Sequence, residues 1–234
     1  PVHAFNLISP TFFANSSTGN KYSLWVNVYG VSERYLNVYG EKDLRAQMNQ
    51  FFHRTYTHPV DGTTLDMKML CNWYWYDETA ILETGKGTKD WNFYRYAETL
   101  LSAAEAIAQS SGVNAEAAGY LAQVKARANM EGKDASTIAS ELQRLGKQAF
   151  IEECWKERLR EFPLEMKIWD DCVRTGKFPQ ISATNKGEVQ FVDLIGAKNG
   201  SGATFKATDL YWPIPVNEIQ RNPNLTQNEG YSAK

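Results

Sequence analysis

The 234-residue sequence predicts a mainly α-helical fold of tetratricopeptide-like helical hairpins, with irregular loop-rich insertions and a minor β component. Three observations predict it. From about residue 90 onward, apolar residues recur with the helical period and many of them are alanine. Residues 67–76 instead alternate with a period of two, which is typical of a strand. Glycine, serine and asparagine fill residues 177–209, which predicts a long surface loop with a hairpin around residues 189–194.

The composition excludes several classes of protein. A net charge of -2 gives no electrostatic reason to expect a nucleic acid or an anionic membrane as a partner. The apolar runs are far shorter than the ~18 residues of a spanning helix. Three cysteines form neither a disulfide framework nor a zinc-binding spacing. Aromatic residues stand out: the chain has 7 Trp, 12 Tyr and 11 Phe, concentrated in the first hundred residues.

Upstream of residue 90, the predicted elements are short. Residues 23–29 are typical of a strand, and Asp43 is placed to cap a helix that extends to Phe52. The alternation in residues 67–76 predicts a strand with tryptophans on one face and tyrosines on the other: Trp73 and Trp75 against Tyr74 and Tyr76.

Downstream, three helices are predicted. The first covers residues 90–111 and ends at Gly112, and the second covers residues 115–130. Alanine-rich contact faces joined by a short loop favour close antiparallel packing of these two helices. A single third helix is predicted for residues 135–162, ending before Pro163. The sequence therefore predicts one full hairpin, although repeat hairpins usually need about three neighbours to bury a continuous core.

The C-terminal stretch, residues 210–231, carries three prolines that forbid a regular helix across it, yet its apolar residues are spaced for docking. Its sequence, LYWPIPVNEIQRNPNLTQNEGY, closely resembles the terminal signature of the SusD/RagB family of outer-membrane glycan-binding lipoproteins. In this chain Trp212 stands between the tyrosine and the first proline of the signature, and Glu229 replaces a proline.

Two internal segments extend the resemblance. Residues 90–106 are similar to the family's hallmark helix. Residues 151–176 are similar to its glutamate- and arginine-rich helix and to the Trp-Asp-Arg-Thr-Gly pattern that ends this motif. The chain departs from the family pattern at three positions that concern packing and an ion pair: Met166, Ile168 and Asp170. Three motifs in the right order indicate a divergent member.

The resemblance implies an organisation and a function. Residues 1–89 form an aromatic-rich irregular segment that holds the ligand site, and residues 90–234 form the helical C-terminal portion with a docked tail. Together they make one structural unit that lacks the N-terminal half of the family fold. The implied function is non-catalytic binding of oligosaccharide or polysaccharide at the extracellular face of the outer membrane. The implied partner is a SusC-like TonB-dependent transporter, and contact with the membrane is only through a lipid anchor absent from this chain.

Residues 72–77, with the sequence NWYWYD, combine the two kinds of group that sugars need. Aromatic faces stack on C–H patches of the ring, and planar amides or carboxylates bind the hydroxyls. We predict a glycan site made of Asn72, Trp73, Tyr74, Trp75, Tyr76 and Asp77, joined by Trp25 and Tyr56. The competing interpretation is that Trp73 and Trp75 are buried in the core, which leaves Tyr74 and Tyr76 as the exposed platform.

No catalytic residue, metal site or cofactor is predicted. Several glutamates and arginines between residues 152 and 161 raise the possibility of paired catalytic carboxylates, but their helical spacing suits structural ion pairs. His53 and His58 lack the spacing of a zinc site, and no nucleotide-binding or hydrolase motif is present. The main alternative to glycan binding is a helical scaffold that caps a transporter without touching sugar. An exposed aromatic cluster favours glycan binding, whereas buried tryptophans and an apolar helix face favour the scaffold.

Overall fold

The structure is a computed structural model that describes residues 31–57, 59, 62–74, 76–79, 90 and 92–232, without the side chains of residues 65–69. These residues fall into two compact units. The first holds the chain up to residue 166 together with residues 181–189, and the second holds residues 167–180 and the chain from residue 190 onward. The predicted strand at residues 23–29, with Trp25, lies outside the described residues.

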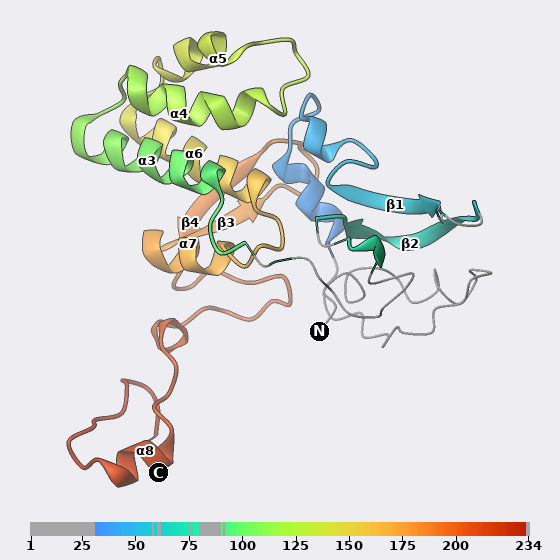
Figure 1. Cartoon of the computed structure of the whole chain (residues 1–234). Coiled ribbons are helices and arrows are strands. Elements are labelled where there is room, and N and C mark those ends of the chain that lie inside the picture. The colour runs from blue at the N-terminus through green and yellow to red at the C-terminus, as the bar shows by residue number, and fades with distance from the viewer. Residues whose placement is uncertain are drawn as a thin grey trace. The chain divides into compact units, whose positions relative to one another are not determined.

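Four helices form the core of the first unit: α3 (Tyr96–Ser111), α4 (Ala115–Ala126), α5 (Ala135–Leu142) and α6 (Lys147–Glu161). In Figure 1, α4 lies between α3 and α5, and α6 lies beside α3. The contact between α3 and α4 is made by alanines and leucines that are fully buried: Leu101, Ala104, Ala108, Ala117, Ala118 and Leu121. Small side chains let the two helices approach closely, which confirms the predicted helical class and its alanine-rich hairpin.

The third predicted helix is wrong as a single element, because it is divided into α5 and α6. The backbone N–H groups of Arg144 and Leu145 bond to carbonyls only three residues earlier, which tightens and ends α5. Gly146, which is unfavourable inside a helix, becomes the N-cap of α6. The first helix also starts later than predicted, at Tyr96, and leaves Phe93 74% exposed.

The end of α6 is joined to the short 3₁₀ helix η1 (Glu33–Val38) and the residues beside it. The last four carbonyl groups of a helix have no partner within it. Here the hydroxyls of Tyr35 and Tyr39 donate to the carbonyls of Leu159 and Arg160, at 2.6 and 2.9 Å. Arg95 donates to the Glu161 carbonyl, and the Phe162 N–H donates to that of Arg158. All four carbonyls are therefore satisfied by residues outside the helix.

A β-hairpin follows η1 in the first unit. Strand β1 (Phe52–Thr57) pairs antiparallel with β2 (Thr64–Asn72), and the register shifts between His53 and Thr55. The helix predicted from Asp43 to Phe52 is wrong: Asp43 caps only the 3₁₀ turn η2 (Leu44–Ala46). Its side chain accepts the Arg45 N–H, but Phe52 already belongs to the strand.

The second unit contains α7 (Ile168–Thr175), most of β3 (Lys177–Ile181) and β4 (Val189–Asp193), η4 (Ala207–Leu210) and α8 (Val216–Arg221). The loop predicted over residues 177–209 is wrong in part, because it contains the paired strands β3 and β4, of which only β4 lies where the hairpin was predicted. Gly176 ends α7 in the left-handed conformation that glycine adopts without strain. Within the described ranges, no helix combines the length and the apolar character that crossing a bilayer requires.

The C-terminal tail is ordered by hydrogen bonds within itself. The Tyr231 hydroxyl lies 2.9 Å from the carbonyls of both Thr208 and Tyr211, and the Gln227 amide bonds in both directions with the backbone of Ile214. Gly230 has φ +84°, and a Cβ there would lie 2.1 Å from the Thr208 methyl carbon, so only glycine fits. Between Pro215 and Pro223 the tail forms only the six-residue helix α8.

Candidate functional site

The aromatic segment after β2 is positioned by Asn72, which is 2% exposed. Its Nδ2 donates to the Pro163 carbonyl at 3.1 Å, and its Oδ1 accepts the Tyr74 N–H at 2.8 Å. The chain then turns, and the Tyr76 N–H donates to the Trp73 carbonyl at 3.0 Å. The predicted strand alternation is therefore wrong beyond residue 72. Because both ends of the Asn72 amide are engaged, its role is to hold the turn.

The turn builds a stack of three rings. The His53 ring lies nearly parallel to the Trp73 indole, with centroids 4.0 Å apart and an angle of 11°. Tyr76 is also nearly parallel to Trp73, at 4.5 Å and 16°. Two parallel rings so near one indole cannot share a face of it, because their atoms would overlap. Trp73 is therefore sandwiched between His53 and Tyr76.

Tyr56 completes the aromatic cluster, with its ring centroid 5.3 Å from that of Trp73 and 5.5 Å from that of Tyr76. In a regular strand His53 and Tyr56 would point to opposite faces, since they are three residues apart. The irregular register between His53 and Thr55 interrupts this alternation. The cluster borders an open hollow of about 300 Å³ lined by Asn49, His53, Thr55, Tyr56, Thr57, Trp73, Tyr76 and Glu78.

The polar groups of the hollow form a hydrogen-bonded chain. The hydroxyls of Tyr56 and Tyr76 bond to each other, and Tyr76 donates to Glu78 Oε2 at 3.1 Å. Burial raises the pKa of both tyrosines, and for Tyr76 the hydrogen bond with Tyr56 raises it further. Burial also lowers the pKa of His53. Near neutral pH the tyrosines are thus protonated and His53 is neutral.

The other predicted residues lie elsewhere. The Tyr74 hydroxyl accepts a hydrogen bond from Asn92 Nδ2 at 3.0 Å, and its ring lies 5.9 Å from the Arg95 guanidinium carbon. Neither Tyr74 nor Asp77 lines the hollow. Trp75 and Trp25 lie outside the described residues. The structure thus brings together three of the predicted residues: Tyr56, Trp73 and Tyr76.

Sequence reasoning missed His53, Asn49 and Glu78. The sequence suggests only a metal-ligand role for His53, which its spacing does not suit, whereas in the structure its ring is stacked on Trp73. Among the described residues, no three His, Cys, Asp or Glu side chains are grouped so that they can hold a metal ion. One signal in the sequence could have identified His53. If residues 52–57 are paired with residues 64–72 as a hairpin, His53 lies opposite Cys71, two residues before Trp73.

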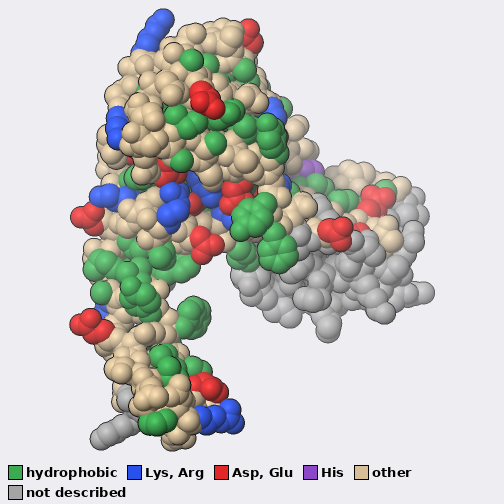
Figure 2. Space-filling model, turned by 60° about the vertical axis from the view of Figure 1, so that its left-hand side comes forward, with side chains coloured by type: hydrophobic (Ala, Val, Ile, Leu, Met, Phe, Trp, Pro, Cys, Tyr) green, Lys and Arg blue, Asp and Glu red, His purple; other side chains and the backbone are tan. Residues whose placement is uncertain are grey.

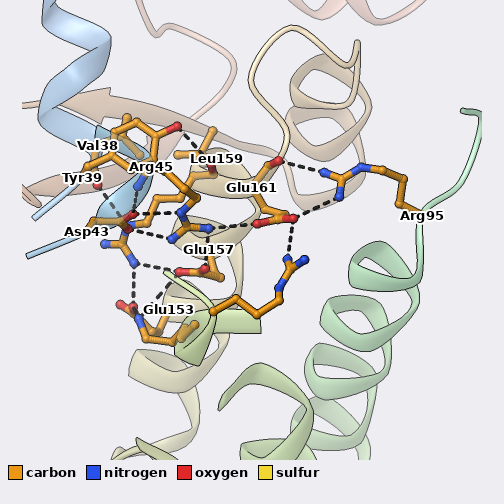
Figure 3. A network of polar contacts seen from close by, with 12 residues as sticks. Val38, Tyr39, Asp43, Arg45, Arg95, Glu153, Glu157, Leu159 and Glu161 are labelled. Carbon is orange, nitrogen blue, oxygen red and sulfur yellow. Dashed lines mark hydrogen bonds and ion pairs between the residues drawn. The ribbon is translucent and has the colours of Figure 1, made fainter. Parts of the chain in front are cut away.

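The charged residues of α6 form a buried network that Figure 3 shows from close by. Arg45 Nη1 lies 2.8 Å from a carboxylate oxygen of Glu157 and 3.0 Å from one of Glu161. Arg95 and Arg127 also pair with Glu161, at 3.0 and 2.7 Å. Most of these partners are far away in the sequence, so the pairs join different elements instead of neighbouring turns of one helix.

Glu157 has no property of a catalytic acid. Burial alone would raise its pKa, but Arg45, Lys125 and Arg160 outweigh burial and hold the pKa at about 2. A larger hollow of about 440 Å³ lies beside the network. Several of its charged groups already pair with each other, for example Lys133 with Glu131 and Glu141. These carboxylates are therefore structural.

The charges drawn on one face of the described residues show no footprint of a polyanionic partner. On the face drawn in Figure 2, cationic and anionic side chains are interspersed, without a large patch of one sign. A basic patch or stripe would be the footprint of nucleic acid binding.

Comparisons with known proteins agree with the fold. A model of the SusD family matches residues 16–231. Over 138 residues the chain is 36% identical to the starch-binding protein SusD of Bacteroides thetaiotaomicron, a match that covers 59% of this chain and 21% of that protein. The crystal structure of a SusD superfamily protein from Parabacteroides distasonis ATCC 8503 matches with a TM-score of 0.78 and 30% identity, over 98% of this chain and 46% of that one. The chain thus spans less than half the length of these relatives, and the resemblance in its three motifs is confirmed: it belongs to the SusD family.

Proposed function

We propose that the chain binds an oligosaccharide or polysaccharide, without catalysis, at the hollow beside His53, Tyr56, Trp73 and Tyr76. One observation carries the proposal: a member of the SusD family presents a stack of three rings beside an open hollow that also holds a carboxylate. A relative named a starch-binding protein supports the same class of ligand.

The stack assigns different roles to its rings. Both faces of the Trp73 indole are covered by protein rings, so Trp73 is the support and not the platform. Sugar C–H groups would then stack on the outer faces of His53 or Tyr76, where rigid rings cost little conformational entropy. Hydroxyl groups of the sugar would bond to Glu78 and Asn49 at the border of the hollow.

The residues of the hollow favour binding without bond cleavage. Glycoside hydrolysis ordinarily uses two carboxyl groups on either side of the scissile bond. Among the described residues that line the hollow, Glu78 is the only Asp or Glu. The glutamates of α6 are held in ion pairs with arginines and lysines.

The biological setting is a further part of this proposal. We infer that the glycan is passed to a SusC-like TonB-dependent transporter at the extracellular face of the outer membrane, and that the full protein is held there by a lipid anchor. Membership of the SusD family supports this assignment.

The test is titration calorimetry with soluble starch, glucomannan, mixed-linkage β-glucan, galactomannan, polygalacturonate and chondroitin sulfate. For any glycan that binds, Tyr76→Ala and His53→Ala are expected to weaken binding about tenfold or more, because stacking and buried area are lost together. Tyr211→Ala removes an exposed tyrosine of the tail and serves as the matched control. Unchanged affinity in both stack variants would place the site elsewhere.

A scaffold that contacts a transporter without binding sugar is the second candidate. It is favoured by three aromatic side chains at the start of α3 with exposed fractions of 72% to 80%: Phe93, Tyr94 and Tyr96. This candidate predicts no binding to any of the six glycans. It also predicts that Tyr94→Ser combined with Tyr96→Ser lowers co-purification with the transporter, while the stack variants do not.

A further inference from the structure

We propose that the hollow selects neutral glycans and discriminates against glycans that carry carboxylate or sulfate groups. This inference rests on the proposed function, because it concerns the ligand of the same site. It is carried by the charges and the hydrogen-bond polarity of the described residues that line the hollow.

Among the described residues that line it, the hollow carries one carboxylate and neither a lysine nor an arginine to balance it. Glu78 is exposed, and none of the other lining residues is a lysine or an arginine. Arg54, the cation on strand β1, does not line the hollow and pairs with Glu33. His53 does line it, but burial lowers its pKa, so its ring is neutral near pH 7. Among the described residues of the hollow, an anionic sugar would therefore meet a carboxylate and no cationic partner.

The direction of the hydrogen bonds supports the same selectivity. Tyr76 donates its hydroxyl proton to Glu78, and the Tyr56 hydroxyl is therefore left to donate to Tyr76. The chain thus ends on an acceptor, the Glu78 carboxylate. A sugar hydroxyl can donate to this acceptor, whereas an ionised carboxylate or sulfate can only accept. Replacing a hydroxyl by an anion consequently removes a hydrogen bond and adds repulsion.

Screening by solvent limits how much affinity an anionic glycan is expected to lose. Like charges brought together at an interface oppose binding, but water and salt around an open hollow screen them. We expect discrimination of about tenfold at low ionic strength, decreasing as salt is added.

The test compares each neutral glycan that binds with the same polymer after oxidation of its C6 hydroxyls to carboxylates, which leaves the backbone and linkages unchanged. Calorimetry at low salt is expected to show about tenfold weaker binding of the oxidised polymer. In Glu78→Gln this difference should shrink to about threefold or less, because the charge is removed but the shape is kept. Glu33→Gln removes an equal charge outside the hollow and should retain the full difference.

Each remaining outcome decides between the two proposals. Equal or tighter binding of the oxidised polymer, or an unchanged difference in Glu78→Gln, would overturn the selectivity. So would binding of polygalacturonate or chondroitin sulfate in the absence of any neutral ligand, although glycan binding itself would then stand. If none of the six glycans binds, the proposed function fails.

Discussion

The first unit contains two regions, one charged and one aromatic, that invert the usual distribution of residues. In and around α6, seven charged side chains of described residues lie in the interior with exposed fractions of 8% or less: Arg45, Glu105, Glu157, Arg158, Arg160, Glu161 and Glu165. At the end of β2, Trp73 and Tyr76 are only half-buried and border an open hollow. Charged groups are rarely buried without partners, and large aromatic groups are mostly buried.

This difference separates the structural ion-pair network from the proposed ligand site. Burying a charge is unfavourable unless partners and hydrogen bonds compensate for it, and the α6 carboxylates have such partners from three other segments. The network thus determines how η2, α3, α4 and α6 fit together. The aromatic rings leave free energy available for a ligand, because part of their surface stays in contact with water.

Breaking the buried network is expected to have the largest effect. Arg45→Met leaves Glu157 and Glu161 short of a partner in the interior, and should lower the free energy of unfolding of the first unit by about 3–5 kcal/mol. Arg54→Met, which breaks the more exposed pair with Glu33, is the matched control and should cost about 1 kcal/mol or less. Urea unfolding followed by circular dichroism measures both. Similar losses in the two variants would contradict the contrast between buried and exposed pairs.

Acid should remove stability through Glu157. Its pKa is lowered from 4.5 to about 2, so the unfolded state binds the proton first as the pH falls. The stabilisation from this carboxylate is fully present above pH 4.5 and is lost between about pH 4.5 and 2. It amounts to roughly 3 kcal/mol by linkage. Unfolding measured across this range should show a weaker pH dependence in Glu157→Gln, and an identical dependence in both proteins would refute the assignment.

Asn72 connects the two regions, because it positions the aromatic turn from a buried site. Asn72→Ala leaves the Pro163 carbonyl and the Tyr74 N–H without this partner, and should cost about 1–3 kcal/mol of stability. Asn92→Ala removes an exposed amide that donates to the Tyr74 hydroxyl, and is expected to change stability by about 0.5 kcal/mol. Thermal unfolding of the two variants compares them directly; equal effects would mean that the turn does not depend on Asn72.

The smallest effect is expected from Tyr76→Phe. The ring that stacks on Trp73 is retained, while the hydroxyl between Tyr56 and Glu78 is lost. Stability should change by about 1 kcal/mol or less, and glycan affinity should fall about threefold, in line with one hydrogen bond. Calorimetry on this variant beside Tyr76→Ala separates the ring from the hydroxyl. A loss as large as that of Tyr76→Ala would show that the hydroxyl, and not the stacked ring, dominates binding.

The fold was predictable where the local spacing of apolar residues determines the secondary structure. The helical period and the alanines of residues 90–126 predicted α3 and α4, since both the period and the contact face are visible in the sequence. The break at residues 143–146 was missed, because the apolar stripe of Ile138 and Leu142 continues past Gly146 without interruption. Only the packing of α5 on α4, and of α6 on α3, shows that two helices are present.

The site was predictable only in part. Composition indicated that aromatics near residue 73 are unusual, but strand alternation assigned Tyr74 and Tyr76 to the same face. The turn after Asn72 separates them: Tyr76 joins the stack, whereas Tyr74 lies beside Arg95. That outcome depends on the hydrogen bond to Pro163, 91 residues away, which no local pattern contains.

The family, the helical class and the hairpin of α3 and α4 could be identified without coordinates, because each depends on residues close together in the chain. Tertiary structure decided which charges pair across the interior and which rings stack. These contacts join residues that are distant in sequence, such as Arg45 with Glu161 and His53 with Trp73. An irregular strand register and a buried asparagine brought His53, Tyr56 and Tyr76 around one indole, because side-chain direction in a bulged hairpin no longer follows a period of two.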